Sequence, residues 1–600
     1  MKIWQPGSHL TAQRGAEVND WSWARTARRV STLARLTAPY RLRTSLAVAS
    51  LVAATLTALA PPFLAKLAID DGISEGDLGH LTVIVVLFVA AGLANLGTSA
   101  AQTYFTGWTG ERVLADLRNK LFGHLQRLSL GYFERNRAGV IISRLTNDVD
   151  ALDQLVTDGV TSLFQNSLLL VGSAVILFFL DWRLALAALA VFPLMAIATS
   201  IFRVRSSRAY RAVRERLGLV TATLAEDIAG MRVVQSFTRE ERNHRQFRAV
   251  NSRYRESNQE TVVLNGLYFP LVDFLSAAAT ATVLGYGGWL ALEGDVTVGT
   301  LFAFLLYLSN FFDPIQQLSQ LYNTFLSAVA ALDKIMEVMD EEPQVVDRPD
   351  AHPLPEIEGR VRFEDVVFGY GDGPEILHGI DLDVPAGTTV ALVGHTGAGK
   401  STIAKLLARF YDPREGRITI DGHDLRDVTQ ESLRRQLGIV PQEGFLFAGT
   451  VRENIAFGRP DATDEDVAAA ARAVGAEDFV LELEDGFGTE VAERGSRLSL
   501  GQRQLVAFAR ALLADPRILV LDEATSSVDI GTERRIELAL RRLLAGRTAF
   551  IIAHRLSTIR RADLIVVLEH GCIVEQGTHD ELVALDGRYR SLYGDWAAAA

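Results

Sequence analysis

Six long apolar stretches constrain the fold of this 600-residue chain more than any other feature. Their approximate spans are 44–69, 81–107, 156–180, 184–202, 262–292 and 298–325. An α-helix needs about 20 mostly apolar residues to cross the hydrocarbon core of a bilayer, and each stretch is of about that length or longer. The pattern therefore predicts six membrane-crossing helices in the first half of the chain.

The connections between these stretches predict the orientation of the helices. Three of them contain no lysine or arginine: DGISEGDLG (71–79), DW (181–182) and EGDVT (293–297). By contrast, residues 203–255 contain thirteen arginines, and residues 112–144 contain six arginines plus Lys120. Because basic loops are retained on the cytoplasmic side, we expect both long connections and both chain ends to lie inside the cell.

The two long basic connections also show helical periodicity, as in LRNKLFGHLQRLSL and LAEDIAGMRVVQSF. We expect the membrane helices to continue into the cytoplasm, with a short crosspiece at each tip near 132–140 and 222–230. Solvated basic loops are the alternative. No secretory signal peptide is expected at the start of the chain, and residues 21–40 predict a basic amphipathic helix at the membrane surface.

Charge and composition separate the chain into unlike halves. Residues 1–340 hold 31 Lys+Arg against 28 Asp+Glu, and residues 341–600 hold 29 against 44. The acidic second half argues against nucleic-acid binding, which relies on basic surfaces, and the single cysteine, Cys572, excludes a disulfide framework. The domains expected are a tail with the surface helix (1–43), a transmembrane domain (44–340), a proline-rich linker (341–358) and a soluble domain (359–600).

The soluble domain contains a phosphate-binding loop. The strand-like run TTVALVG leads into Gly394-His395-Thr396-Gly397-Ala398-Gly399-Lys400-Ser401, and the helical run STIAKLLARF follows. The glycines let backbone amides turn onto phosphates, and we expect a side chain at Gly399 to crowd a nucleotide. Lys400 is predicted to neutralise phosphate oxygens, Ser401 to bind Mg²⁺, and the helix start with Thr402 to face the phosphates.

A second motif, PRILVLDE, predicts a buried strand that ends in two acids. Asp522 is expected at the carboxyl end of this strand, beside the phosphate loop, where it holds Mg²⁺. Glu523 is then placed to orient or deprotonate the attacking water. Two solvated acids after a core strand are the alternative.

Between these motifs, Leu498-Ser499-Leu500-Gly501-Gln502 and the following RQLVAFARALLADP resemble the signature and helix of ATP-binding-cassette (ABC) proteins. The other motifs of that family also have counterparts: Tyr370 in VVFGYGDG for the adenine-stacking aromatic, Gln442 in IVPQ for the glutamine loop, Ser526-Ser527-Val528-Asp529 for the D-loop, and His554 in TAFIIAH for the switch histidine. Together with the six apolar stretches, residues 21–595 resemble an ABC exporter half-transporter.

The resemblance implies an all-α six-helix transmembrane domain followed by an α/β P-loop ATPase domain with a helical signature subdomain. It also implies a dimer with a second half-transporter subunit, a homodimer more readily than a heterodimer, in which ATP lies between the phosphate loop of one cassette and the signature of the other. Ser499, Gly501 and Gln502 would then face the γ-phosphate, Gln442 would reach Mg²⁺ and the water, and His554 would contact the γ-phosphate.

Two positions depart from the family pattern. Leu500 stands where the third signature residue is most often glycine, and Ala492 stands where glycine is usual in the exporter-specific TEVAERG segment. Neither change removes a catalytic group, so we expect them to affect the geometry of the interface and the turnover rate.

The function implied is ATP-driven export of lipophilic or amphipathic compounds, or lipids, from a bacterial cytoplasmic membrane. A lipid flippase and an importer on the exporter scaffold are alternatives, and a soluble ABC ATPase would lack the six apolar stretches. Asp273 lies inside the fifth stretch, where it either favours cationic or hydrogen-bonding amphiphiles, or makes an interhelical hydrogen bond or packs as a protonated acid. Aromatic residues of the sixth stretch either line an apolar pathway or are lipid-facing or core residues: Phe302, Phe304, Tyr307, Phe311 and Phe312.

Overall fold

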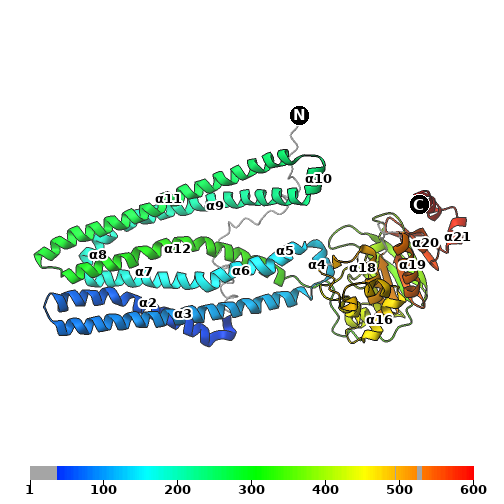
Figure 1. Cartoon of the computed structure of the whole chain (residues 1–600), viewed down its shortest axis with the longest axis horizontal. Coiled ribbons are helices and arrows are strands. Elements are labelled where there is room, and N and C mark those ends of the chain that lie inside the picture. The colour runs from blue at the N-terminus through cyan, green and yellow to red at the C-terminus, as the bar shows by residue number, and fades with distance from the viewer. Residues whose placement is uncertain (1–36, 443, 493–494, 523–529, 554, 600) are drawn as a thin grey trace. The chain divides into compact units, whose positions relative to one another are not determined.

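The structure is a computed structural model that describes residues 37–599 except 443, 493–494, 523–529 and 554. It contains two compact units (Figure 1). The membrane unit comprises residues 1–126 and 139–340, and the cassette unit comprises residues 127–138 and 341–600. The predicted surface helix lies outside the described residues up to position 36.

Six helical spans in the membrane unit are long and apolar enough to cross a membrane, so this prediction is confirmed: Ala38–Ile73, Leu78–Leu125, Val160–Leu180, Trp182–Ala229, Glu240–Glu293 and Val298–Leu318. The helices are α2 (Arg41–Leu67), α3 (Leu78–Leu125), α5 (Ala138–Ser143), α6 (Val149–Asp153), α7 (Val160–Leu180), α8 (Trp182–Leu189), α9 (Phe192–Ala229), α10 (Met231–Ser236), α11 (Glu240–Glu293) and α12 (Val298–Met339). Several helices extend far beyond the apolar stretches, as the periodicity of the basic connections predicts.

Helix caps close the three connections that lack basic residues. The carboxylates of Asp77 and Asp181 each accept two backbone N–H bonds, at 2.8 to 3.1 Å, at the starts of α3 and α8. Gly294, with a φ of 87°, ends α11, and the Thr297 side chain caps α12. Because the first amides of a helix have no partner within it, such caps fix where each chain reversal occurs.

The second crosspiece lies further along the chain than predicted. Helices α9 and α11 lie side by side, and α10 joins them at the tip (Figure 1). The prediction of a crosspiece at 222–230 is therefore wrong, because residues 222–229 continue α9 and the short helix spans Met231–Ser236. The segment TATLAEDIA contains no helix breaker, so α9 ends only at Gly230, where a residue without a side chain lets the backbone turn.

Packing of the membrane unit decides between two readings of its aromatic residues. Phe304, Tyr307, Phe311 and Phe312 are all at most 4% exposed and belong to the apolar core, whereas Phe302 is 44% exposed. The pathway hypothesis is thus wrong for Phe304, Tyr307 and Phe312, whereas Phe311 also lines a pocket together with Phe192. For Asp273, the Nε2 amide of Gln316 on α12 donates a hydrogen bond of 3.0 Å to the Oδ1 atom, which is the interhelical alternative.

Two sheets build the cassette unit. The first has the order β2-β1-β4-β5, with β1 (Val361–Phe368), β2 (Leu377–Val384), β4 (Glu415–Ile420) and β5 (His423–Asp424). The second has the order β10-β9-β3-β8-β7-β6, with β3 (Thr389–Val393), β6 (Leu437–Val440), β7 (Ile518–Asp522), β8 (Thr548–Ile552), β9 (Leu564–Glu569) and β10 (Cys572–Gly577). Strands β9, β3, β8, β7 and β6 run parallel, and their continuous apolar runs fit burial on both faces.

Helices cover these sheets and form the signature subdomain. They are α13 (Lys400–Leu407), α14 (Gln430–Arg435), α15 (Val451–Ile455), α16 (Asp464–Ala473), α17 (Glu477–Leu481), α18 (Leu500–Leu513), α19 (Ile530–Leu544), α20 (Leu556–Ile559), α21 (His579–Ala584) and α22 (Arg588–Ala599). Helix α18 packs against α15 and α16. The cassette unit also includes α4 (Leu130–Arg135), the first crosspiece, and the linker side chains Leu354 and Ile357 are buried.

Candidate functional site

The strand register brings the predicted chemistry to one edge of the parallel sheet. Leu392 of β3 and Asp522 of β7 both pair with Ile552 of β8. The phosphate loop, which begins just after β3, and the half-buried Asp522 therefore lie at the same edge of the sheet. Carboxyl edges of parallel sheets are where such folds bind ligands. The predicted catalytic Glu523 and His554 come next in the chain after β7 and shortly after β8, and they lie outside the described residues, as does the D-loop segment 526–529.

Gln442 comes from the neighbouring strand on this edge. Val440 of β6 pairs with Leu521 of β7, and the exposed Gln442 follows two residues later. Its position after β6 is therefore comparable to that of Asp522 at the end of β7. An amide and a carboxylate at adjacent strand ends provide oxygen ligands of the kind that Mg²⁺ accepts.

Backbone geometry explains the glycines of the phosphate loop. Gly394, Gly397 and Gly399 have φ angles of 150°, 86° and 106°, which favour glycine. A Cβ on Gly399 would lie 2.6 Å from the Leu377 side chain, and one on Gly394 would lie 2.2 Å from the carbonyl oxygen of Leu568. These two glycines therefore let the loop pack closely against β2 and β9.

Between these glycines the loop presents both exposed and buried residues. His395, Thr396 and Gly397 are exposed, whereas Ala398 is buried beneath the loop. Ser401, in the first turn of α13, is also exposed. His395, Thr396, Gly397 and Ser401 therefore form the exposed part of the predicted phosphate site, at the start of the helix.

Lys400 lies across this loop. Its side chain is only 7% exposed, and Nζ donates hydrogen bonds to the carbonyl oxygens of Gly394 at 2.7 Å and His395 at 3.0 Å. Burial lowers the pKa of Lys400, and the charge of Asp522 partly opposes that effect. A cation with little water around it binds phosphate oxygens strongly, because few solvent contacts need to be replaced.

Tyr370, the predicted adenine-stacking residue, is linked to the same helix. Its hydroxyl lies 3.2 Å from Thr402 Oγ1 on α13. Its ring meets that of Tyr411 edge-on, with centroids 5.0 Å apart, and Lys405 Nζ lies 5.3 Å from the Tyr370 ring centre. The structure therefore joins two predicted residues, Tyr370 and Thr402, to two residues that the sequence motifs did not reveal, Lys405 and Tyr411.

Glu134 on α4 completes this cluster. Its Oε1 atom lies 2.8 Å from Lys405 Nζ, and its Oε2 atom accepts a hydrogen bond of 2.8 Å from the Tyr411 hydroxyl. Burial is the largest single influence and disfavours the charged Lys405, but the hydrogen bond to Glu134, the Glu134 charge and the Tyr370 hydroxyl together outweigh burial and raise the pKa of Lys405. Burial and the Glu134 carboxylate also raise the pKa of Tyr411. One available signal in the sequence was that Glu134 is one of only two acids, with Asp116, in the basic connection 112–144.

Further contacts fix α4 on the cassette of its own chain. Arg135 forms an ion pair of 3.0 Å with Glu341, and the Ser129 hydroxyl accepts a 3.0 Å hydrogen bond from the Val345 amide. A Cβ on Gly131 would lie only 3.0 Å from the Tyr411 ring, which shows how closely the two segments approach. The expectation that a crosspiece docks on a cassette is confirmed for this one.

The signature residues form a helix cap. The Ser499 hydroxyl accepts a 3.3 Å bond from the Gln502 amide N–H, and the Ser499 N–H donates a 2.8 Å bond to the Gln502 side chain. Ser499 is exposed, Leu500 is half-buried and Gly501 is buried. In the part of the chain that the structure describes, no hydrogen bond joins Ser499 to the phosphate loop. Within one chain, the signature is held by its own helix.

Ala492 shows a structural consequence of departing from the family pattern. Its φ is 58°, in the left-handed region where a Cβ is disfavoured. A residue with a side chain pays about 1 kcal/mol or more in this conformation, whereas glycine adopts it readily. The usual glycine at this position therefore has a backbone explanation.

Apolar helices long enough to span a bilayer and a P-loop cassette with a capped signature helix define a membrane-bound transport ATPase. Residues 44–315 match the family described as "ABC transporter transmembrane region", and residues 377–526 match the family described as "ABC transporter". The chain belongs to the ABC transporter family. It has the exporter fold, spans the membrane several times with its cassette in the cytoplasm, and couples ATP hydrolysis to transport.

Similar proteins cover almost the whole chain. An uncharacterised ABC transporter ATP-binding protein of Bacillus subtilis, YknV, is 42% identical over 95% of this chain and 94% of its own length. An ATP-dependent lipid A-core flippase of Syntrophus aciditrophicus is 40% identical over 94% of this chain and 93% of its own length. The solved structure of a bacterial Atm1-family ABC exporter with ATP bound has a TM-score of 0.77 and 32% identity, covering 93% of this chain and 98% of that chain.

Proposed function

We propose that this chain exports lipophilic or amphipathic compounds, or lipids, as a homodimer driven by ATP binding and hydrolysis. The observation that carries the proposal is the cluster from Tyr370 through Tyr411 and Lys405 to Glu134. It connects the side chain proposed to stack on adenine with the crosspiece between two membrane helices. Nucleotide binding at Tyr370 can therefore change the contacts of Lys405 and Tyr411 with Glu134 on α4.

In the proposed site, the residues from Gly394 to Thr402 surround the phosphates and Tyr370 stacks on adenine. Lys400 exchanges its two loop carbonyls for phosphate oxygens. The hydroxyl of Ser401, the amide of Gln442 and the carboxylate of Asp522 are suitable ligands for Mg²⁺, which prefers oxygen and keeps several waters. When bound, Mg²⁺ would neutralise phosphate charge.

The catalytic roles proposed for the remaining residues follow from their types. Glu523 is the general base that orients and deprotonates water, and His554 contacts the γ-phosphate. Ser499, Gly501 and Gln502 of one subunit face the γ-phosphate held by the other, through the exposed start of α18. Because this chain has both Glu523 and His554, two copies would form two complete sites.

Helix α10 is proposed to be the second docking element. Its region exposes apolar side chains: Met231 is 41% exposed, Val233 60% and Phe237 70%. Exposed apolar residues at a helical tip favour a binding partner. We assign that partner as the cassette of the second subunit, so that closure of two cassettes acts on both crosspieces of each chain.

Reconstitution of the purified chain in liposomes tests the function. ATP should drive movement of a fluorescent phospholipid between leaflets, and Glu523→Gln should retain ATP binding while losing about 100-fold or more of the ATPase rate. Glu482→Gln, at an exposed acid of the cassette, is the matched control. Undiminished ATPase in Glu523→Gln would refute the assigned base, and hydrolysis by a strict monomer would refute the paired site.

A further inference from the structure

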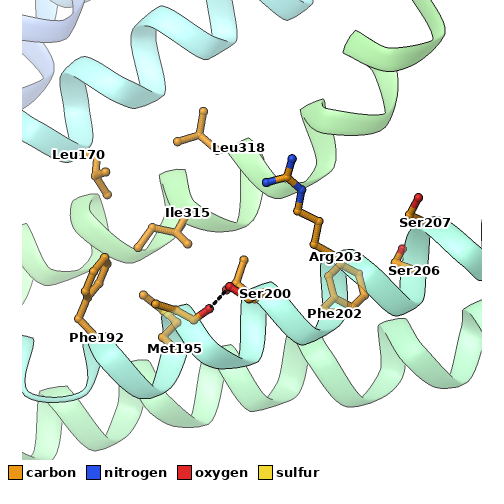
Figure 2. A pocket seen from close by; sticks show the side chains of 12 residues that line it. Leu170, Phe192, Met195, Ser200, Phe202, Arg203, Ser206, Ser207, Ile315 and Leu318 are labelled. Carbon is orange, nitrogen blue, oxygen red and sulfur yellow. Dashed lines mark hydrogen bonds between the residues drawn. The ribbon is translucent and has the colours of Figure 1, made fainter. Parts of the chain in front are cut away.

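A pocket of about 450 Å³ lies among α7, α9 and α12 in the membrane unit (Figure 2). Its volume is in the range of binding sites for small molecules, about 300 to 1,000 Å³. Leu170, Phe192 and Met195 line one end of the pocket, and Arg203, Ser206 and Ser207 line the other. The pocket is therefore divided into an apolar end and a polar, positively charged end.

The length of the apolar part matches a lipid chain. Phe192 and Arg203 are eleven residues apart on α9, which corresponds to about 16 Å at the helical rise of ~1.5 Å per residue. Half of the hydrocarbon core of a bilayer is about 15 Å thick. An acyl chain of ordinary length in one leaflet would thus extend from the polar end to the apolar end.

The charge pattern of the sequence places the polar end at the cytoplasmic surface of the membrane. Arg203 is the first of the thirteen arginines in residues 203–255, the basic connection retained inside the cell. The part of α9 from Phe192 to Phe202 then lies at the depth of the inner leaflet.

Hydroxyl groups in the middle of the pocket already have partners. Thr199 Oγ1 lies 3.1 Å from the Tyr268 hydroxyl, and the Ser200 hydroxyl donates a 2.8 Å bond to the Ala196 carbonyl oxygen. The Ser200 hydroxyl hydrogen is thus used within its own helix and the Thr199 hydroxyl is joined to Tyr268, so both groups tolerate contact with hydrocarbon. The charged side chain of the pocket lining, Arg203, lies with Ser206 and Ser207 at the other end.

We propose that this pocket binds an amphiphile with an acyl chain and an anionic headgroup, such as a phosphate. The Arg203 guanidinium, which stays charged and can donate two parallel hydrogen bonds, recognises the headgroup together with the Ser206 and Ser207 hydroxyls. The inference rests on the proposed function and narrows its substrate class. It also replaces the expectation of a cationic substrate, because the Asp273 carboxylate accepts a hydrogen bond from Gln316 and does not line this pocket.

Equilibrium binding to the full-length chain in uncharged phosphatidylcholine nanodiscs tests the pocket. The probes share a twelve-carbon chain and differ in the headgroup: dodecyl phosphate, dodecyl maltoside and dodecyltrimethylammonium. Dodecyl phosphate should bind most tightly, and Arg203→Gln should weaken its binding about tenfold while leaving dodecyl maltoside unchanged. Arg205→Gln, an exposed arginine on the same helix outside the pocket lining, is the matched control and should have no effect.

A second variant tests the apolar end. Met195→Trp should fill the space beside Phe192 and weaken the binding of all three probes. Inorganic phosphate alone should not displace dodecyl phosphate, since displacement at equal concentration would indicate a simple anion site and overturn the amphiphile proposal.

Other results would also contradict the proposal. Equal affinity for the three headgroups, or equal losses in Arg203→Gln and Arg205→Gln, would overturn the charge assignment. A disulfide between two copies of Ser207→Cys that excludes dodecyl phosphate would show that a second chain covers the pocket. Because binding is measured without ATP, its failure is distinguishable from failure of ATP-driven export.

Discussion

The phosphate loop and signature of the cassette unit hold their polar groups differently from the buried Tyr307 of the membrane unit. In the cassette, Lys400 Nζ donates hydrogen bonds to carbonyl oxygens five and six residues away. Ser499 caps α18 through hydrogen bonds with Gln502, three residues later in the chain. In the membrane unit, the Tyr307 hydroxyl donates a 2.5 Å bond to the Leu59 carbonyl oxygen, 248 residues away. Because these hydrogen bonds of the cassette are local, short sequence motifs predict them. The partner of Tyr307 depends on how helices far apart in the sequence pack together.

Lys400→Ala tests the short-range hydrogen bonds of the phosphate loop and should have a greater effect than the other variants. Lys400→Ala removes the cation that bonds to Gly394 and His395, so the loop loses both its closing contacts and its phosphate ligand. We expect the ATPase rate to fall about 100-fold or more, measured by phosphate release from the purified protein.

Lys120→Ala, at an exposed lysine of α3, serves as the control for that measurement. Near-normal ATPase activity in Lys400→Ala would contradict this prediction, because the hydrogen bonds of Lys400 within the loop would then make no contribution to ATP hydrolysis.

The next largest effect concerns the contact between α4 and the cassette. Glu134→Gln removes the charge that faces Lys405 and Tyr411, weakening two charge-assisted hydrogen bonds. Lipid transport per ATP hydrolysed should fall about tenfold, since about 1.4 kcal/mol of docking free energy corresponds to that factor. Transport and ATPase are to be measured on the same liposomes.

Asp150→Asn is the matched control for Glu134→Gln, because its carboxylate forms an exposed ion pair with Arg118 within the membrane unit. Exposed pairs contribute little to stability. Equal coupling losses in both variants would argue that α4 is not the coupling element.

A smaller effect is expected at the distant bond of the membrane unit. Tyr307→Phe leaves the Leu59 carbonyl without its side-chain donor while preserving the packed ring. Polar contacts between membrane helices contribute about 0.6 kcal/mol on average, so the free energy of unfolding in detergent should fall by about 1 kcal/mol or less. A loss as large as that of a core cavity would show that this contact organises the whole helix bundle.

The smallest effect is expected at Ala492. Replacing it with glycine removes the Cβ from a backbone with a φ of 58°, but glycine loses more conformational freedom on folding, so Ala492→Gly should stabilise the cassette by a net value of about 1 kcal/mol or less. Thermal unfolding of the full chain measures this gain. A destabilised Ala492→Gly protein would show that the alanine side chain makes contacts worth more than the strain.

The sequence predicts the cassette site better than the tertiary contacts of either unit. The strand before Gly394 and the strand ending at Asp522 follow from short-range patterns, the helix after Ser499 follows from the family resemblance, and the structure has each of them. Lys405 and Tyr411 could not be assigned in this way, because their role depends on Glu134, more than 270 residues earlier in the chain for Tyr411. Such a pairing requires the fold.

The membrane unit shows the same limit. Apolar length and arginine distribution predict six helices, but they did not place the second crosspiece, which depends on Gly230 ending α9. Nor did they decide between core and pathway for Phe304 and Tyr307, because an aromatic stripe on a membrane helix suits both. Burial against other helices settles the question.

The inclusion of residues 127–138 in the cassette unit has a practical consequence for dissecting this protein. The chain enters that unit twice, so a fragment expressed from residue 341 onward would lack a piece of its own surface. Tyr411 and Lys405 would then meet water in place of Glu134, and ATPase rates of such a fragment would describe a cassette whose transmission contact has been cut away.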